Sequence, residues 1–233
     1  GDNVGLAIAA GCAAGIGAGV VVGLINGVVT SVFKISSFIV TLATSSIAFG
    51  VALKLTGGLP VTGLPDEFIS GLGTGKVWIF AVPLIVAVVI GVLFYGLLNW
   101  TRFGRHTYAI GGNEEAARAA GVPVVRTRIM VAVTGSTLAA VAGIMLTARI
   151  SSGEPNLGAQ YPLQTIAAAV LGGVSLFGGE GRLLGAVIGA LFITVLGVGM
   201  DLVNIESFDQ QIVFGVLLIM ALVVDRARAR MQG

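Results

Sequence analysis

The chain has 233 residues, of which 56% are hydrophobic and only 10% carry a charge, and its formal net charge is +2. This composition lies far outside the range of soluble domains, so it excludes a soluble enzyme and makes a nucleic-acid partner unexpected. A single cysteine, Cys12, excludes a disulfide within the chain. The sequence therefore predicts an integral membrane protein in contact with lipid.

Seven apolar segments predict an all-α, polytopic bundle of membrane helices. Most of them reach the ~20 residues that a helix needs to cross ~30 Å of hydrocarbon. The fifth is shorter and contains Gly172 and Gly173, so we expect either a short, tilted crossing or a broken helix buried by its neighbours. The segments are residues 4–25, 35–53, 77–98, 129–148, 165–177, 183–200 and 208–224.

The distribution of positive charge predicts the orientation, since Lys and Arg accumulate on the cytoplasmic side of a membrane. With seven crossings and an outer N-terminus, the outer side receives only Lys54, Lys76 and Arg149. The inner side receives Lys34, Arg102, Arg105, Arg118, Arg126, Arg128, Arg182, Arg226, Arg228 and Arg230. We therefore expect an N-out, C-in topology and one transmembrane domain over residues 1–233. Because the first apolar run begins almost at once, we also expect an N-terminally truncated fragment.

The first segment carries a glycine at every fourth position, which places a stripe without side chains on one helix face. Such stripes permit close contact between membrane helices, because association in lipid depends on packing. The partner is either another helix of the same chain or a second subunit, and both alternatives are open. The stripe consists of Gly11, Gly15, Gly19, Gly23 and Gly27.

The loop after the second segment is rich in glycine and proline, with room for one short helical piece around Asp66 to Ile69. Its GLGTGK stretch at 71–76 differs from a phosphate-binding loop, which would have glycine at Ser70 and Ser or Thr at Val77. The chain contains no metal-ligand cluster and no nucleophile paired with a base. We therefore expect no catalytic residue, no cofactor and no metal, and we do not expect an enzyme.

The loop at 99–128 is the most polar part of the chain, and it predicts a short helix over 113–120. Asn113 can cap the helix, and Glu114 with Glu115 places negative charge on its first turn. Arg118 stands one turn after Glu114. Gly121 can adopt the left-handed conformation that ends a helix. So short a helix is marginal alone in water, so we expect it to be held against the membrane domain or a soluble partner, although a solvated linker is the alternative.

Neutral polar residues remain inside the apolar segments, whereas no Asp, Glu, Lys, Arg or His falls in the middle of one. A proton- or ion-coupled carrier would need such groups. The neutral residues could line a path for an uncharged, hydroxyl-rich solute, or they could bond to neighbouring helices or to their own i−4 carbonyls. The path candidates are Thr41, Thr44, Ser45, Thr134, Ser136 and Gln164.

Residues 104–122, which read GRHTYAIGGNEEAARAAGV, resemble the cytoplasmic loop of the permease subunits of ATP-binding-cassette (ABC) sugar importers for ribose, xylose, arabinose and galactose. The resemblance extends to FIVTLATSSIAFGVALKLTGG at 38–58, to residues 148–191 and to LLIMALVVD at 217–225. It covers essentially the whole chain. The glycine-rich upstream region that is usual in this family is missing here.

The resemblance implies a bacterial inner-membrane permease that imports a monosaccharide, a ribose-like pentose or a hexose. It implies a permease homodimer, a separate ATP-binding subunit below it and an extracytoplasmic sugar-binding protein above it. The helix at 113–120 would be the coupling helix, which passes the movement of the ATPase to segments 77–98 and 129–148. Its small alanines would permit close seating, and its flanking glycines would permit bends. The coupling residues would be Gly111, Gly112, Asn113, Glu114, Glu115, Ala116, Ala117, Arg118 and Gly121.

Two rival functions stay open. A branched-chain amino-acid ABC permease would share the architecture, but it should offer helix N-termini or a charged anchor for a zwitterion, and none is evident. A passive channel or secondary carrier would have no use for a capped, alanine-rich cytoplasmic helix, and its transport would continue without ATP.

Overall fold

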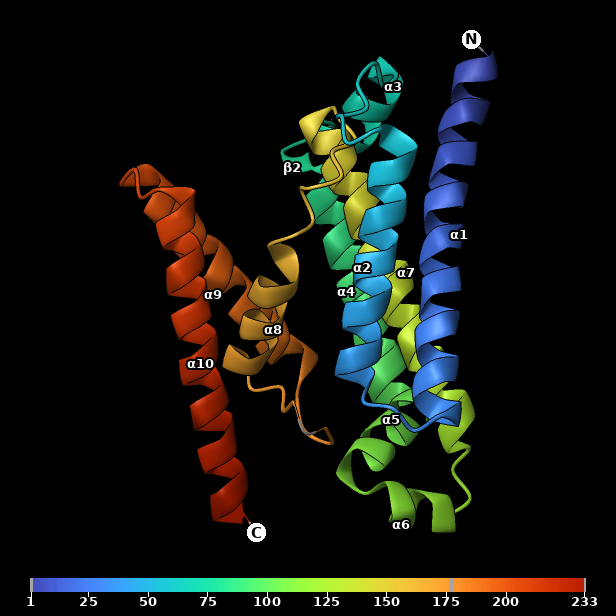
Figure 1. Ribbon diagram of the computed structural model, residues 1–233, viewed down its shortest axis with the longest axis vertical. Helices are drawn as coiled ribbons and strands as arrows, with labels where there is room; N and C mark the ends of the chain where they lie inside the picture. Colours follow the sequence, from blue (N-terminus) through green and yellow to red (C-terminus); the bar gives the residue numbers. More distant parts are fainter. Residues whose placement is uncertain (1, 177, 233) are drawn as a thin grey trace. The chain divides into compact units, whose positions relative to one another are not determined.

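The chain folds into α-helices that match the seven expected apolar segments. The computed structural model describes the backbone of residues 2–176 and 178–232 and the side chains of residues 4–176 and 178–225. Among these described residues, six helices are long and apolar enough to cross a membrane. These are α1 (Asp2–Val32), α2 (Ser37–Thr56), α4 (Val82–Trp100), α7 (Val124–Ile150), α9 (Leu183–Leu202) and α10 (Ser207–Gln232), labelled in Figure 1. The prediction of a polytopic helical bundle is confirmed, while the arginines at 226–230 have side chains outside the described residues.

The helices fall into two compact units, each described here by itself. The first unit comprises Gly1–Phe103 and Pro123–Leu157, and the second comprises Gly104–Val122 and Gly158–Gly233. The loop between α4 and α7 thus belongs to a different unit from the two helices that it connects. A single transmembrane domain over residues 1–233 stays a prediction.

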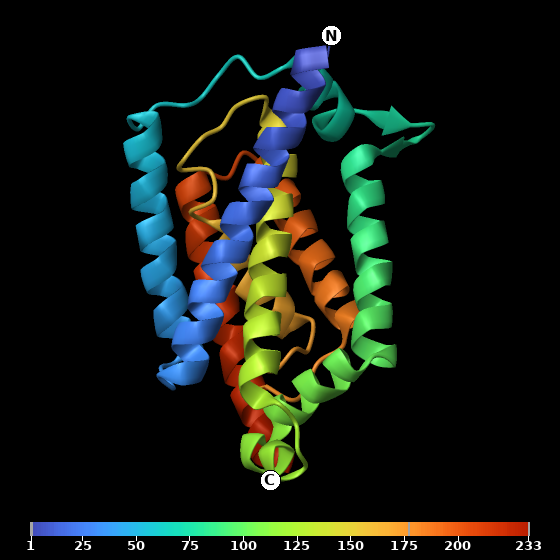
Figure 2. The same ribbon diagram turned by 90° about the vertical axis from the view of Figure 1, so that its right-hand side faces the viewer.

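In the first unit, α1 lies along α7, and the glycine stripe of α1 forms the contact (Figure 2). A Cβ atom added at Gly19 would lie 2.8 Å from the carbonyl oxygen of Ser136, and one added at Gly27 would lie 2.7 Å from the Cα of Ile129. Substituents at Gly15 and Gly23 would also meet α7. Four of the five stripe glycines therefore pack within the chain, which decides between the two alternatives for this face.

The loop after α2 folds onto the C-terminal end of α7. Its helical piece begins with α3 (Asp66–Phe68), as predicted, and continues as the π-helical turn η1 (Ile69–Gly73). Gly73 packs directly against the carbonyl group of Ala148. A two-stranded hairpin follows, with β1 (Lys76–Val77) antiparallel to β2 (Phe80–Ala81). Val61 and Gly153 exchange two backbone hydrogen bonds of 2.9 Å, so this loop is also attached to the chain that follows α7.

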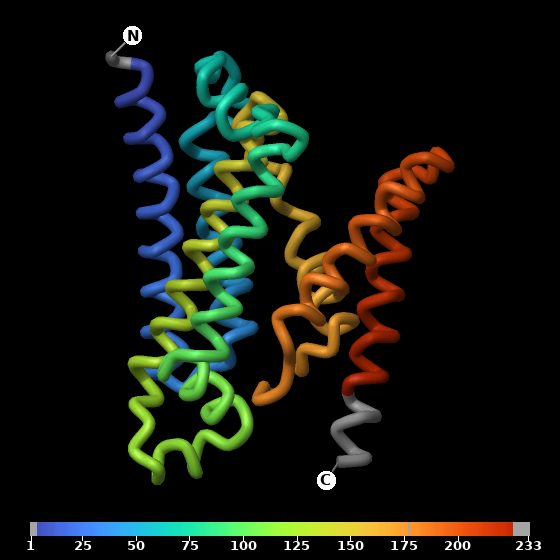
Figure 3. The backbone as a smooth tube through the Cα atoms, turned by 180° about the vertical axis from the view of Figure 1, so that it is seen from behind, coloured from blue at the N-terminus to red at the C-terminus, as the bar shows by residue number. Residues whose placement is uncertain are grey.

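In the second unit, the short helix α8 (Tyr161–Leu171) packs against both α9 and α10 (Figure 3). The α8–α9 crossing is so close that Gly185 contacts the backbone of Gly172, and Gly189 contacts the carbonyl oxygen of Ala168. Side chains from all three helices form the core beside this crossing. They are Ala167, Ala168, Ile193, Met200 and Phe214.

The fifth apolar segment forms only a short helix, which lies earlier in the chain than predicted. α8 has 11 residues, so its length is about 16 Å at 1.5 Å per residue, or half of the hydrocarbon thickness. It ends at Leu171 and not at 177, because Gly173 adopts a left-handed φ of 83°. Before α8, Gly153 pairs with Val61 in the loop after α2. After α8, Gly181 accepts a hydrogen bond from the hydroxyl group of Tyr108.

Candidate functional site

The loop between α4 and α7 contains two helices, of which only the second matches an expected element. The first, α5 (Arg102–Gly112), buries Gly104 and Ile110. The signal that could have predicted α5 is a helical spacing of i, i+4 and i+7, which is shown by Phe103, Thr107 and Ile110. On the opposite face, Arg105 is exposed.

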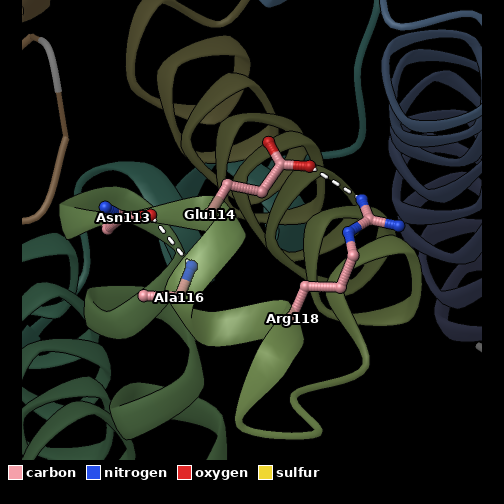
Figure 4. Close-up of polar contacts among 4 residues, drawn as sticks. All are labelled: Asn113, Glu114, Ala116 and Arg118. Atoms are coloured by element: carbon pink, nitrogen blue, oxygen red, sulfur yellow. Dashed lines mark hydrogen bonds and ion pairs between the residues drawn. The ribbon is translucent and has the colours of Figure 1, made fainter.

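The second helix, α6 (Glu114–Ala119), begins with the predicted cap. The Oδ1 atom of Asn113 accepts a hydrogen bond of 2.9 Å from the backbone N–H of Ala116, and Asn113 itself is extended, with φ −157° (Figure 4). Arg118 donates a 2.9 Å hydrogen bond to Glu114 within the predicted ion pair, which is shown in the same view. Because this pair is largely exposed, its contribution to stability is at most about 0.5 kcal/mol. The cap therefore defines the start of α6 more strongly than the ion pair does.

The C-terminal end of α6 is a Schellman motif. Gly121 has a left-handed φ of 79°, as predicted. Its N–H donates to the carbonyl of Arg118, and the N–H of Val122 donates to the carbonyl of Ala117, both at 3.0 Å. These two bonds satisfy carbonyl groups that the end of a helix leaves unpaired. A six-residue helix is thus specified at both ends by its own sequence.

The orientation of α6 separates its alanines into two groups. Ala117 is 5% exposed and packs inward against its own chain, whereas Glu115, Ala116 and Ala119 are exposed. At 100° per residue, Glu115 and Ala119 lie opposite Ala117 on the helix. The outward face, defined as Glu115, Ala116 and Ala119, is therefore the surface that a partner can reach. Ala119 was not among the expected coupling residues.

The expected role of Gly111 and Gly112 as a bend is wrong, because both residues lie inside the last turn of α5. The change of direction occurs one residue later, at the extended Asn113. Gly111 is required for another reason. A Cβ atom there would collide with the backbone N of Gly179 and would lie 2.9 Å from its Cα atom.

The six residues of the predicted path are distributed over both units, and several of them bond to their own helices. Thr41, Ser45 and Thr134 donate to carbonyl groups three or four residues earlier. Ser136 lies at the α1–α7 contact, beside Gly19 and Gly23. Gln164 lies on α8 in the second unit. The path stays a prediction for these residues.

Thr44 has a partner on another helix, because its hydroxyl group donates a 2.7 Å hydrogen bond to the Oδ1 atom of Asn26 on α1. Asn26 is 7% exposed. We expect Thr44→Val to lower the free energy of unfolding by about 0.5–2 kcal/mol, since it leaves a buried amide oxygen without this donor. The measurement is thermal unfolding of the purified protein in detergent. Thr41→Val is the matched control, because it removes a hydroxyl that bonds only within α2. If both variants lowered the free energy of unfolding equally, this would contradict a stabilising role for the hydrogen bond to Asn26.

Titratable side chains do not gather into a metal site in the described part of the chain, where His, Cys, Asp and Glu form no group of three. The features that this site does present are a short, doubly capped helix with an exposed face and a glycine contact behind it.

Comparison with known proteins identifies similar permeases. The family model described as "Branched-chain amino acid transport system / permease component" matches residues 2–222. The ribose import permease protein RbsC of Bacillus subtilis is 42% identical over 197 residues, which cover 84% of this chain and 61% of that protein. The L-arabinose transport system permease protein AraH of Escherichia coli is 44% identical over 197 residues, covering 84% and 60%. This chain thus spans about three fifths of the length of these relatives. No solved structure gives a significant match.

Proposed function

The chain belongs to the family of branched-chain amino acid transport system permease components, and on that premise we propose that it is the transmembrane subunit of an ABC importer for a monosaccharide. The substrate is a ribose-like pentose or a hexose, and the site of action is a bacterial inner membrane. The observation that carries the proposal is the 37–44% identity to permeases named for ribose and arabinose, which extends over more than four fifths of this chain.

The proposed partners follow from the same relationship. A separate ATP-binding subunit supplies the ATP hydrolysis, and an extracytoplasmic binding protein delivers the sugar. The permease acts as a homodimer. The exposed face of α6, with its small alanines, supports the contact with the ATP-binding subunit, because small side chains allow a close approach of two backbones.

In the proposed cycle, ATP binding closes the ATPase dimer and displaces α6, and the displacement opens the transport path toward the binding protein. Hydrolysis of ATP then resets the permease. The uncharged interior of the apolar segments suits a sugar, which needs hydrogen bonds but no counter-charge. A branched-chain amino acid would instead need partners for an ammonium group and a carboxylate, so this alternative is less favoured despite the family's name.

The test uses the complete permease as its natural gene encodes it, with a C-terminal tag, purified from native membranes in mild detergent. We expect an ATP-binding subunit to co-purify with it. In proteoliposomes that contain both subunits and the binding protein, we expect ATP-dependent uptake of labelled ribose or arabinose and no uptake of leucine. Uptake of leucine would favour the amino-acid alternative. If sugar uptake continued without ATP and no ATPase co-purified, the protein would be a passive channel or a secondary carrier instead of an ABC importer subunit.

A further inference from the structure

The loop between α8 and α9, residues 172–182, is the structural neighbour of the α5–α6 region. Three of its glycines have φ values that other residues rarely adopt, namely Gly178 at 94°, Gly179 at 78° and Gly181 at 145°. Within the loop, the N–H of Ser175 donates to the carbonyl of Glu180 at 3.1 Å, and the N–H of Gly178 donates to the carbonyl of Ser175 at 3.3 Å. These bonds and dihedral angles define the backbone conformation of the loop on either side of residue 177.

On one side this loop is packed against the C-terminal end of α5. A substituent at Gly111 would collide with Gly179, and one at Gly179 would lie 2.7 Å from both the N and the Cα of Gly112. The two backbones therefore touch without intervening side chains. Beside this contact, the hydroxyl group of Tyr108 donates a 3.1 Å hydrogen bond to the carbonyl of Gly181. A displacement of α5 toward the α8–α9 loop therefore pushes directly on that loop, because backbone atoms in contact have no side chain that could yield.

The same loop is attached to α8, α9 and α10. It continues directly into α8 and α9, which cross through the close contacts of Gly172, Gly185 and Gly189. In addition, the N–H of Leu176 donates to the carboxylate of Asp225 on α10 at 3.4 Å. A force on the α8–α9 loop is thus distributed over α8, α9 and α10.

We propose that the α8–α9 loop receives the movement of the α5–α6 region and passes it to α8, α9 and α10, with Gly111, Gly179 and Tyr108 as the positioning residues. This inference rests on the proposed function and extends it. The expected route ran through α4 and α7, which are covalently joined to the α5–α6 region. The grouping of Gly104–Val122 with α8–α10 in one compact unit adds a second route, made of packing contacts. By this second route, the ATPase would also move the short helix α8.

The test compares two helical glycines in the complete permease, reconstituted with its ATP-binding subunit and binding protein. Gly111→Ala places a methyl group against the backbone of Gly179. Gly50→Ala on α2 is the control, because among the described residues nothing lies within 4 Å of a Cβ atom there and α2 belongs to neither route. The readouts are recovery of the ATPase, the rate of ATP hydrolysis and the amount of sugar imported per ATP hydrolysed.

We expect Gly111→Ala to retain the ATPase and its hydrolysis rate within about twofold, while sugar imported per ATP falls about tenfold. Gly50→Ala should match the wild type. Equal sugar-to-ATP ratios in the two variants would overturn the proposal. Loss of ATPase recovery with Gly111→Ala alone would also overturn it, since Gly111 would then act in docking and not in transmission.

A second variant keeps the test decisive if Gly111→Ala does not accumulate in the membrane. Tyr108→Phe removes only the hydroxyl group that bonds to Gly181, and we expect the sugar-to-ATP ratio to fall about two- to fivefold with the ATPase still bound. An unchanged ratio in this variant would count against the proposed route. If the wild-type permease recovers no ATPase, the proposed function itself fails, and this result is independent of every variant.

Discussion

If the chain acts in the proposed importer, sugar uptake is expected to fall at least about 100-fold when Ala119 is replaced by arginine, because the long side chain would hold the outward face of α6 away from the proposed ATP-binding subunit. A loss of this size corresponds to about 2.7 kcal/mol of binding free energy, which is within the range of central interface residues. Ala119 is exposed and lies opposite the buried Ala117, so the substitution leaves the inner packing of the loop intact. The measurements are ATP-dependent sugar uptake and co-purification of the ATPase.

Two further variants make this result specific to docking. Ala119→Ser keeps the side chain small and is expected to match the wild type in both measurements. Ala117→Arg places a charge in a position that is 5% exposed, so it should disrupt the loop itself and lower the amount of folded permease. If Ala119→Arg retained the ATPase and normal uptake, α6 would not be the docking element.

Replacing Gly189 with leucine is expected to prevent the second unit from folding. A Cβ atom at this position collides with the carbonyl oxygen of Ala168 and would lie 2.9 Å from the N of Gly172, so α8 and α9 could no longer cross at their native distance. Overpacking a well-packed site costs about 1–3 kcal/mol, and the cost is larger where the obstacle is backbone, which cannot change its rotamer. Against a typical total stability of about 5–15 kcal/mol, such a loss should sharply lower the yield of monodisperse protein and its thermal midpoint.

The control for this prediction lies on the same helix. Among the described residues nothing lies within 4 Å of a Cβ atom at Gly199, so Gly199→Leu introduces the same side chain into α9 without a collision. Leucine has a higher helix propensity than glycine, by roughly 0.8 kcal/mol, so this variant should be neutral or slightly stabilised. Similar losses of yield in both variants would show that α9 rejects leucine for a reason other than its crossing with α8.

Several features of the protein could be predicted from sequence because their causes are local. The apolar segments follow from the length of hydrocarbon that a helix must cross. The cap at Asn113, the ion pair between Glu114 and Arg118 and the left-handed Gly121 each involve residues within a few positions of one another. The glycine stripe of α1 predicted a close contact, although it did not identify the partner helix.

Other features depend on contacts between distant parts of the chain, and for these the sequence pattern was incomplete or misleading. The helix expected at 165–177 is α8 at 161–171, because apolar residues continue along the chain beyond the point where Gly173 ends the helix. Ala117 and Ala119 are the same residue type on the same short helix, and only the packing of α6 buries Ala117 and leaves Ala119 exposed. Gly111 was interpreted as a bend, although its role depends on the backbone of Gly179.

The sequence by itself determined that this is a helical membrane protein, where its long apolar helices lie and how the short helix α6 starts and stops. Only the tertiary structure decided that α1 packs on α7, which face of α6 is exposed, and that the α5–α6 region touches the α8–α9 loop. The physical reason is the range of the interactions. Hydropathy and capping act between neighbouring residues, whereas the hydrogen bond from Tyr108 to Gly181 joins positions that are 73 residues apart. Such a contact exists only after the helices have packed.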